Sequence, residues 1–390
     1  MPHPNADNLR FPPPRLPPEV AALRAEVRAF LAESFSNEAW PRNSDFGAGF
    51  SPDFTRKIAA KGWVGMTWPK KYGGQERSML ERYVVTEELL AAGAPVFAHW
   101  IADRQSGPLL LRFGSEAQRE TVLPRITAGE CFFSIGMSEP DSGSDLASVR
   151  TRAERTSQGW RLNGAKVWTS NAHHNHFMIT LCRTGDAGED RHGGLSQFLI
   201  DLKNDGVAIN PIINMLGGHE FNEVVFDDVE IPADRLIGGE GDGWRQVTSE
   251  LAYERSGPER FLSNFHVFRA LVDEVGPSPD GRQAEGLGRL ASRLWTLRRM
   301  SLSVAAMLGA GDAPDVEAAI VKDLGNRFER EVVETARMIL PLQPSGLAGA
   351  NQNDFAATMA EAILRLPSFT LRGGTTEIMR SIIARGLGLR

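Results

Sequence analysis

Apolar residues in the first part of the chain recur at the spacing of a helix. They follow one another at three- and four-residue steps, as seen for Val20, Leu23, Val27, Phe30 and Leu31. Residues at these steps share one helix face, which can bury against the rest of the protein. From Leu16 onward the pattern therefore predicts a helix with a buried face.

Helix-capping residues mark the next helices. Ser51 precedes Pro52, a combination typical of an N-cap followed by a first-turn proline. Ser78 with Glu81 forms a capping box, and Ser115 with Gln118 repeats it. The first third of the chain is therefore predicted to be helical, with short loops at glycine and proline.

The hydrophobic period changes near Cys131. Short apolar or alternating runs follow one another with turn residues between them, and Asn163-Gly164 is a hairpin signal. These runs are "CFFSIGM", "VRTRAER", "WRLNGAKVWTS", "FMITLCRT", "LSQFLIDL" and "NEVVFDDVEIP". Because no helical stretch separates them, we expect an antiparallel sheet or barrel and not a doubly wound sheet.

Helical spacing returns after Pro232. A helix beginning near Gly243 is expected to reach Val275 with an interruption at Gly257-Pro258. Further helices are predicted near residues 283–308, 315–340 and 354–366, and a last one after Thr375. The predicted fold is α+β and multidomain: an N-terminal helical domain (1–125), a middle antiparallel β-barrel domain (126–236) and a C-terminal domain like a four-helix bundle (237–390).

The charge, cysteine content and hydrophobicity of the chain argue against several classes of protein, including nucleic-acid-binding and membrane proteins. The 390 residues carry a formal net charge of −6, so a basic face for nucleic acid is not expected. Two cysteines, Cys131 and Cys182, provide no disulfide framework and suit a reducing compartment. The N-terminus has no signal-peptide pattern, and no apolar run approaches the ~20 residues of a membrane helix. We therefore expect a cytoplasmic protein with no membrane partner.

Two stretches carry candidate chemistry. In "GMSEPDSGSD", the turn at Pro140–Gly143 can converge backbone N–H groups, and Ser138 and Ser144 add hydroxyls. In "NGAKVWTSNA", Trp168 offers a flat apolar face with Thr169 and Ser170 beside it. A tricyclic cofactor can stack and hydrogen-bond on such a surface. Taken singly, each stretch is more simply explained as an ordinary turn or a core-facing strand.

Together with three other segments, these stretches resemble the acyl-CoA dehydrogenase family. "SEPDSGSD" is similar to its Thr/Ser-Glu-Pro-x-x-Gly-Ser-Asp signature, and "NGAKVWTSN" to its Asn-Gly-x-Lys-x-Trp motif. "WPKKYGG", "FNEVVFDDVEIPADRLIG" and "GGTTEIMRSIIARGLGL" resemble its N-terminal turn, the strand that closes its β domain and its C-terminal helix. The similarity runs in the same order from about Leu16 to the C-terminus.

The resemblance implies an FAD enzyme that removes two hydrogens from an acyl-CoA thioester and passes electrons to an electron-transfer flavoprotein. Ser144 would lie near the flavin phosphates or the CoA. The implied cofactor-binding residues are Met137, Ser138, Gly143, Ser144, Trp168, Thr169, Ser170, Thr375 and Glu377.

A departure from the family concerns the catalytic base. Many members have a glutamate directly before the Gly-Thr of the C-terminal motif, but the matching residue here is Gly373. Isovaleryl-CoA dehydrogenase and its relatives instead place the base on the helix after the β domain, and Glu254 matches it. Glu254 is therefore the expected base; the alternative is a surface ion-pairing residue. Arg255 is expected to orient Glu254 or to face the CoA, and a surface salt bridge is the alternative.

Two family motifs that reach the FAD of a neighbouring subunit have no counterpart in this sequence. The expected assembly is a homodimer or homotetramer, or a heterotetramer with a related subunit that completes the site. A non-catalytic subunit and a flavin monooxygenase on the same fold are the alternative functions. His173, His174 and His176 do not have the spacing of metal ligands, so no metal site is expected.

Overall fold

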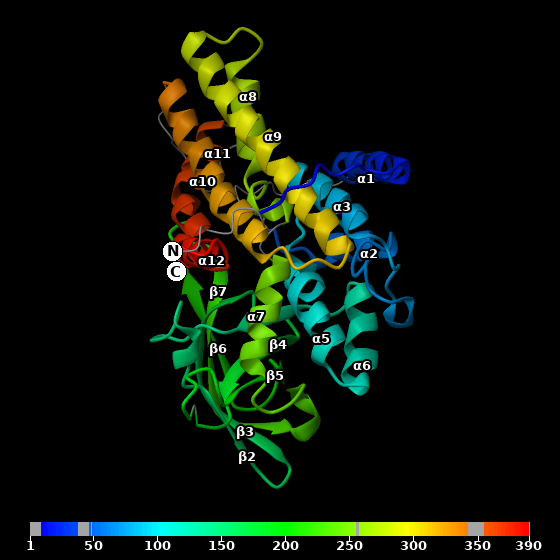
Figure 1. Cartoon of the computed structure of the whole chain (residues 1–390), viewed down its shortest axis with the longest axis vertical. Helices are drawn as coiled ribbons and strands as arrows, with labels where there is room; N and C mark the ends of the chain where they lie inside the picture. Colours follow the sequence, from blue (N-terminus) through cyan, green and yellow to red (C-terminus); the bar gives the residue numbers. More distant parts are fainter. Residues whose placement is uncertain are drawn as a thin grey trace. The chain divides into compact units, whose positions relative to one another are not determined.

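The computed structural model describes residues 9–37, 47, 49–186, 188–254, 257–341 and 355–389; side chains are not described for residues 37 and 250–254. The chain forms two compact units (Figure 1). Unit 1 comprises residues 1–50, 77–96 and 252–390, and unit 2 comprises residues 51–76 and 97–251. Both units therefore combine segments that are far apart in the sequence.

Unit 1 is helical. Its helices are α1 (Pro18–Asn37), α3 (Met79–Ala91), α8 (Phe265–Val275), α9 (Gly281–Gly309), α10 (Asp315–Ile339), α11 (Phe355–Arg365) and α12 (Thr376–Gly386). The predicted face of α1 is confirmed, because Val20 is buried in a cluster with Tyr83 and Leu302. The long helices α9 and α10 run side by side, and α8 and α11 pack with α10 (Figure 1).

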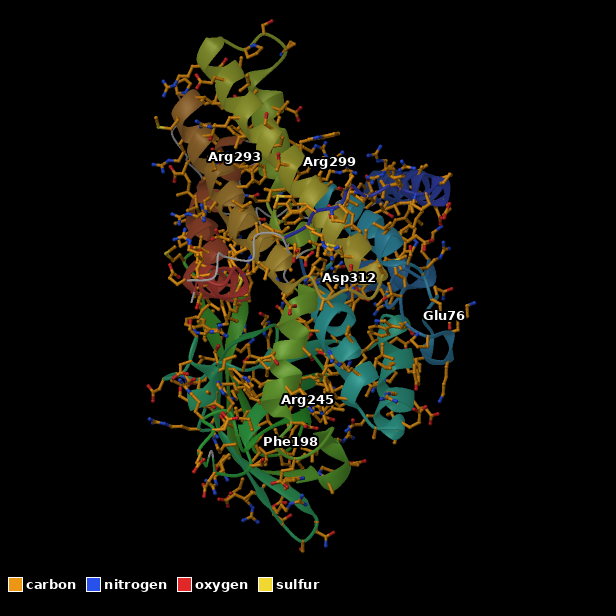
Figure 2. The ribbon with its side chains drawn as sticks, viewed as in Figure 1. Glu76, Phe198, Arg245, Arg293, Arg299 and Asp312 are labelled. Atoms are coloured by element: carbon orange, nitrogen blue, oxygen red, sulfur yellow. The ribbon has the colours of Figure 1, made fainter. Side chains whose placement is uncertain are left out.

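Charged side chains connect the helices of unit 1. Figure 2 shows Arg293 on α9, and its guanidinium pairs with Glu331 of α10. Arg289 contacts the same carboxylate at 3.2 Å. Closer to the core, the buried Glu87 of α3 accepts from Arg298 of α9 at 2.6 Å.

Unit 2 contains short helices and a sheet. The helices are α2 (Pro52–Ala60), α4 (Phe97–Ile101), α5 (Gly107–Phe113), α6 (Glu116–Thr127) and most of α7 (Gly243–Glu254), and a π-helical turn, Ala102–Ser106, joins α4 to α5. The strands are β1 (Phe133–Gly136), β2 (Arg152–Arg155), β3 (Gly159–Ser170), β4 (Phe177–Arg183), β5 (Leu195–Asp201), β6 (Val207–Ile213), β7 (His219–Pro232) and β8 (Leu236–Ile237).

The predicted antiparallel barrel is corrected to an open, mixed sheet. The strand order is β6-β7-β3-β2-β4-β5-β8, with β1 paired to β4 outside this path. In the described residues the end strands β6 and β8 do not pair with each other, so the sheet does not close. The pairings β1–β4 and β2–β4 are parallel, and the other pairings are antiparallel.

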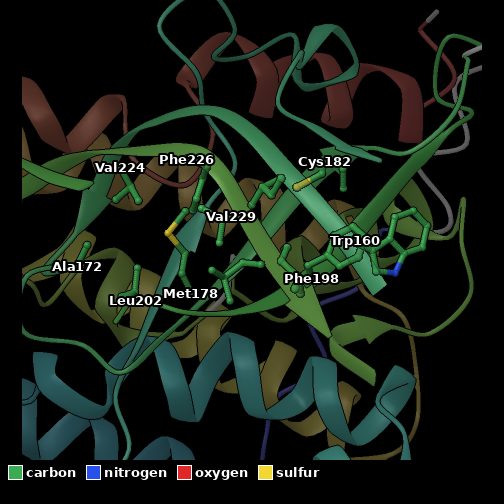
Figure 3. Packing of buried hydrophobic residues seen from close by; sticks show 13 residues of the cluster. Trp160, Ala172, Met178, Cys182, Phe198, Leu202, Val224, Phe226 and Val229 are labelled. Atoms are coloured by element: carbon green, nitrogen blue, oxygen red, sulfur yellow. The ribbon is translucent and has the colours of Figure 1, made fainter. Parts of the chain in front are cut away.

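One layer of side chains forms the core of the sheet (Figure 3). Trp160 of β3 meets Phe198 of β5 edge-on with ring centroids 5.2 Å apart, and Met178 and Val229 lie in the same cluster. Buried aromatic and aliphatic area of this kind is the main stabilising contribution to such a domain. The strand β3, which carries one of the candidate motifs, therefore rests on a packed support.

Asn163-Gly164 is not a hairpin turn. It lies inside β3, where the register to β7 shifts between Leu162 and Gly164. Asn163 donates to Asp228 Oδ1 at 2.9 Å, and its own Oδ1 accepts the Asp228 amide at 2.8 Å. A Cβ on Gly164 would lie 2.6 Å from Thr151 Oγ1, so this glycine permits a close approach of Thr151, the residue that precedes β2.

The predicted caps and helices are confirmed. Ser51 caps α2, and both capping boxes are complete at Ser78 and Ser115. The interruption at Gly257-Pro258 is also present, because a 3₁₀-helix begins at Pro258. Among the helices of the described residues, none has the length and apolar character needed to cross a bilayer.

Candidate active site

The two candidate motifs lie next to each other in unit 2. The loop after β1 carries Met137 to Ser144, and β3 carries Trp168 to Ser170. The Val167 amide donates to the Ser138 carbonyl at 2.9 Å, which joins loop and strand directly. The structure therefore brings the first motif beside the second.

A bulge in β3 presents the Trp168 indole. The register between β3 and β7 shifts between Lys166 and Thr169, and Trp168 has a φ of +59°. Left-handed backbone is uncommon for a bulky residue and often marks functional positions. Trp168 is 61% exposed within the described chain. Its indole packs edge-on against the Phe221 ring, with ring centroids 6.3 Å apart. A large, flat, apolar surface is thus displayed on the strand.

Two residues with hydroxyl groups directly follow Trp168 along β3. The Thr169 hydroxyl is buried and has no hydrogen-bond partner among the described residues. A buried hydroxyl of this kind needs a hydrogen-bond partner, which a bound cofactor or a water molecule can supply. Ser170 is half-buried, and its carbonyl accepts from Ser134 Oγ at 2.8 Å. These features fit the isoalloxazine of FAD, which combines a flat face with polar edges.

The loop after β1 is held by its own side chains. The Met137 side chain packs against an apolar cluster that includes Val247 of α7, while the Met137 carbonyl accepts from Lys166 Nζ at 3.1 Å. Glu139 and Ser142 exchange backbone hydrogen bonds of 2.8 and 3.1 Å. Gly143 and Ser144 are exposed beyond this turn, and a Cβ on Gly143 would meet nothing within 4 Å. Their expected roles toward flavin phosphate or CoA stay predictions.

Lys166 and Glu139 are charged residues that the sequence analysis missed. Lys166 is fully buried, and its Nζ lies 2.7 Å from Glu139 Oε1. Desolvation lowers the pKa of Lys166, and the ammonium in turn holds the pKa of Glu139 below its usual value against the opposing effect of burial. The burial of Lys166 could have been predicted from the sequence. Alternate residues of a strand point to the same face, and Lys166 lies an even number of positions from the core residues Trp160 and Leu162 of β3.

His173 and His174 stack with His219, whereas the ring of His176 lies against Phe132 with ring centroids 5.5 Å apart. The His173 ring lies parallel to that of His219 at 3.8 Å and tilted against that of His174 at 3.9 Å. Desolvation, followed by the neighbouring imidazoles, lowers the pKa of His173 to about 4. No group of three or more His, Cys, Asp or Glu within the described chain is arranged to hold a metal ion.

In unit 1, the C-terminal motif forms the start of α12. Thr375 is the N-cap and accepts the Ile378 amide. Hydrogen bonds from its own backbone N–H and from Thr375 hold the pKa of the exposed Glu377 carboxyl below its usual value. The preceding Gly373 and Gly374 have φ values of +62° and +96°, which glycine tolerates far better than other residues.

A buried lysine fixes this double-glycine loop. Lys322 of α10 is fully buried, and its Nζ donates to the carbonyls of Arg372 at 2.8 Å and Gly374 at 2.5 Å. The Arg372 guanidinium donates to Ser263 Oγ at 2.6 Å and pairs with the buried Glu329 at 3.4 Å. Gly373, the position where many relatives have their base, is thus held in a defined backbone conformation.

Glu254 is the last residue of α7. The helix is fixed at its other end, where a Cβ on Gly243 would lie 2.7 Å from the backbone of Leu195 and Val247 packs on β4 and β5 residues. From Gly243 to Glu254 a helix rises about 16 Å. The side chain of Glu254 and all of Arg255 lie outside the described residues, so their expected roles stay predictions.

Comparison with protein families matches nearly the whole chain. Residues 17–130 match the acyl-CoA dehydrogenase N-terminal domain, 134–229 the middle domain and 241–388 the C-terminal domain of that family. The acyl-CoA dehydrogenase IpdE1 of Mycobacterium tuberculosis is 35% identical over 393 residues, covering 95% of this chain and 98% of the relative.

Solved structures share the fold. The Tcur3481-Tcur3483 steroid ACAD superposes with a TM-score of 0.85 at 26% identity, covering 96% of this chain and 98% of that chain. The ChsE4-ChsE5 complex from Mycobacterium tuberculosis gives a TM-score of 0.80 at 26% identity, with 96% and 99% covered.

Proposed function

The chain belongs to the acyl-CoA dehydrogenase family and is an oxidoreductase acting on CH–CH groups, and from that premise we propose that it is an FAD-dependent dehydrogenase converting an acyl-CoA thioester to the 2-enoyl-CoA. The observation that carries the cofactor assignment is the surface around Trp168. An exposed indole on left-handed backbone stands beside a buried hydroxyl of Thr169 that has no partner in the described residues.

Residues of unit 2 would bind and orient the flavin. Trp168 would pack on the ring system, and Ser138, Thr169 and Ser170 would donate to its polar edge. Bound FAD would supply the acceptor for the β-hydrogen, which leaves the substrate as hydride. In unit 1, Thr375 and Glu377 at the start of α12 match family positions for cofactor binding, and their role toward FAD is part of this proposal.

Glu254 would remove the α-proton as the α,β double bond forms. Two features of this sequence support the assignment. Position 373, which carries the base in many relatives, is glycine, and Glu254 ends a helix anchored on the sheet at its beginning. A positioned carboxylate of this kind contributes about 10²–10⁴ to the rate of such a proton transfer. Arg255 would orient the carboxylate or contact the CoA.

We propose a bulky acyl group for the substrate. Gly373 places no side chain at the position where many relatives have their base, which would leave room for the acyl group, whereas a Cβ on Gly374 would already lie 2.9 Å from Met379 Cε. One similar solved structure is named a steroid ACAD, which fits a polycyclic acyl thioester. An electron-transfer flavoprotein would reoxidise the flavin, and a cytoplasmic location remains part of this proposal.

A second candidate function is that of a subunit in a heteromeric dehydrogenase. The family motifs that reach the FAD of a neighbouring subunit are missing from this sequence. A related subunit would then complete the adenosine end of the site. The similarity to the ChsE4-ChsE5 complex favours this candidate over a flavin monooxygenase.

The test is to purify the chain, record its visible spectrum, and titrate it anaerobically with a panel of CoA thioesters that includes steroid-derived ones. The proposal predicts a flavin spectrum and bleaching near 450 nm by a bulky thioester, with the 2-enoyl product. A flavin that is bound but bleached by no thioester supports the non-catalytic subunit. Hydroxylated product under air would indicate a monooxygenase instead.

A further inference from the structure

A buried ion pair connects the two candidate flavin-binding segments of unit 2. Lys166 of β3 is fully buried, and the Glu139 side chain is 8% exposed. The Lys166 Nζ lies 2.7 Å from Glu139 Oε1 and 3.1 Å from the Met137 carbonyl oxygen. A single ammonium group therefore bonds to two residues of the loop after β1.

The Glu139 carboxylate has further partners in the next segment. Its Oε2 accepts the Arg150 amide at 2.7 Å, and its Oε1 accepts the Thr151 amide at 2.9 Å. Both oxygens are thus hydrogen-bonded, and the carboxylate joins the loop, β3 and the segment leading into β2. The methylene stem of Lys166 is also packed, because a Cβ on Gly136 would lie 3.2 Å from its Cγ.

A buried pair of this kind is a costly way to hold two segments together. Removing both charges from water costs several kcal/mol for each ion, and apolar residues of similar volume often stabilise a fold equally well. The pair is therefore weak evidence for a contribution to stability alone. Its position, between two segments that must keep a defined relation, suggests a role in specifying their geometry.

The neighbours of the pair are the candidate flavin contacts. Glu139 directly follows Ser138, and Lys166 precedes Trp168 by two residues. Between them, the Val167 amide donates to the Ser138 carbonyl at 2.9 Å, which turns the Ser138 carbonyl toward β3. The ion pair and this hydrogen bond set the distance between the Ser138 donors and the bulge that displays the indole.

We propose that Lys166 and Glu139 are positioning residues that hold the Ser138 loop and the Trp168 bulge in the arrangement that binds the flavin ring of FAD. This inference rests on the proposed function, because it assumes that FAD occupies this surface. Neither residue needs to touch the cofactor. A binding site that is already held in its bound conformation by surrounding residues loses less conformational entropy when its ligand binds.

The experiment compares FAD binding by Lys166→Met, Glu139→Gln, the double variant and the wild-type chain. The matched control is Arg161→Met, which removes an exposed ion pair of the same strand, at 3.0 Å from Glu230. Apoprotein is titrated with FAD by fluorescence quenching, the absorption spectrum of bound flavin is recorded, and the melting temperature of the apoprotein is measured separately.

We expect either single variant to weaken FAD binding by about tenfold or more and to alter the band shape near 450 nm, because one buried charge then lacks its partner. The double variant should bind FAD better than either single variant, and Arg161→Met should bind as the wild type does. If a single variant fails to fold, the double variant is compared with the wild type instead. Weaker FAD binding and an altered flavin absorption band in the double variant support the inference.

Lower melting temperatures with an unchanged dissociation constant and flavin spectrum would show a purely structural pair and overturn the inference, while leaving the proposed function intact. A wild-type chain that binds no FAD, alone or with a related subunit, would overturn both.

Discussion

At the scale of single residues, His99 shows how burial determines protonation. This imidazole is 6% exposed in unit 2, and its Nδ1 lies 3.1 Å from the Thr55 hydroxyl. Desolvation lowers its pKa from 6.5 to about 4, so the folded protein holds the neutral form at neutral pH. The side chain thus links the stability of unit 2 to pH.

The sign of that dependence follows from the lowered pKa. Below pH 6.5 the unfolded chain binds a proton at His99 that the folded chain takes up only near pH 4. Stability from His99 is therefore complete above pH 6.5 and is lost as the pH falls toward 4, by an amount on the order of 3 kcal/mol. His99→Gln removes this group, so thermal melting of the variant should fall less steeply between pH 7 and 4.5.

The control is His192→Gln, because this half-buried histidine has a side chain that is 36% exposed, far more than that of His99. Since other histidines of unit 2 also have lowered pKa values, wild type and variant must be compared at each pH. Parallel melting curves for wild type and His99→Gln would mean that His99 is not buried in its neutral form.

Residue types in the motifs could be read from the sequence, but their local conformations could not. Trp168 and its neighbours were identified as a candidate ring surface, whereas nothing in the sequence indicated a left-handed backbone at a tryptophan. Lys166 was missed because a lysine in a strand is normally solvated. Its burial depends on a partner 27 positions earlier in the chain.

At the scale of elements, the capping boxes explain where the helices begin. Ser78 accepts the Glu81 amide at 3.2 Å, and Glu81 accepts the Ser78 amide at 2.8 Å. Ser78→Ala removes one of these bonds from the start of α3 and should destabilise the protein by about 1 kcal/mol. A lower urea midpoint with an unchanged slope checks this expectation.

Ser36→Ala provides the comparison, because Ser36 is an exposed serine in the last turn of α1 whose hydroxyl donates to the Glu33 carbonyl of the same helix at 2.8 Å. Alanine has a higher helix propensity than serine, so this variant should be neutral or slightly stabilising. Equal destabilisation by both substitutions would contradict the capping explanation.

Helix starts were predictable because their signals are local, whereas strand pairing was not. The Asn163-Gly164 pair has the composition of a tight turn, yet Asn163 bonds across the sheet to Asp228. Closure of the sheet depends on whether the end strands meet, and β6 and β8 are end strands paired to β7 and β5. Such non-local choices leave no signature in the period of the hydrophobic residues.

At the scale of the whole molecule, the proposed heteromeric assembly would determine whether one chain holds FAD. If a related subunit completes the adenosine end of the site, the chain expressed alone should retain little FAD. Co-expression with a related acyl-CoA dehydrogenase subunit from the same genome should raise the FAD content and give a heterotetramer by light scattering. A fully loaded homo-oligomer from the single chain would contradict the heteromeric assembly.

The division of the chain was only partly accessible from sequence. Helical, sheet and helical segments follow one another as expected, but unit 1 combines residues 77–96 with the C-terminal part. Long-range packing of α3 against α9, through Tyr83 and Leu302, produces this combination. The pattern of residues along the sequence predicts helices and strands well, but it does not predict which of them pack together. For the same reason, Glu254 was inferred as the base from family resemblance and not from packing.

The most direct test of the account is anaerobic reduction of the Glu254→Gln protein by the thioester that bleaches the wild type. The exposed Glu274→Gln on α8 serves as control. We predict that Glu254→Gln binds FAD normally but is bleached at 450 nm at least about 100-fold more slowly, while Glu274→Gln matches the wild type. Bleaching of Glu254→Gln at the wild-type rate would contradict the assignment of the base and with it the proposed mechanism.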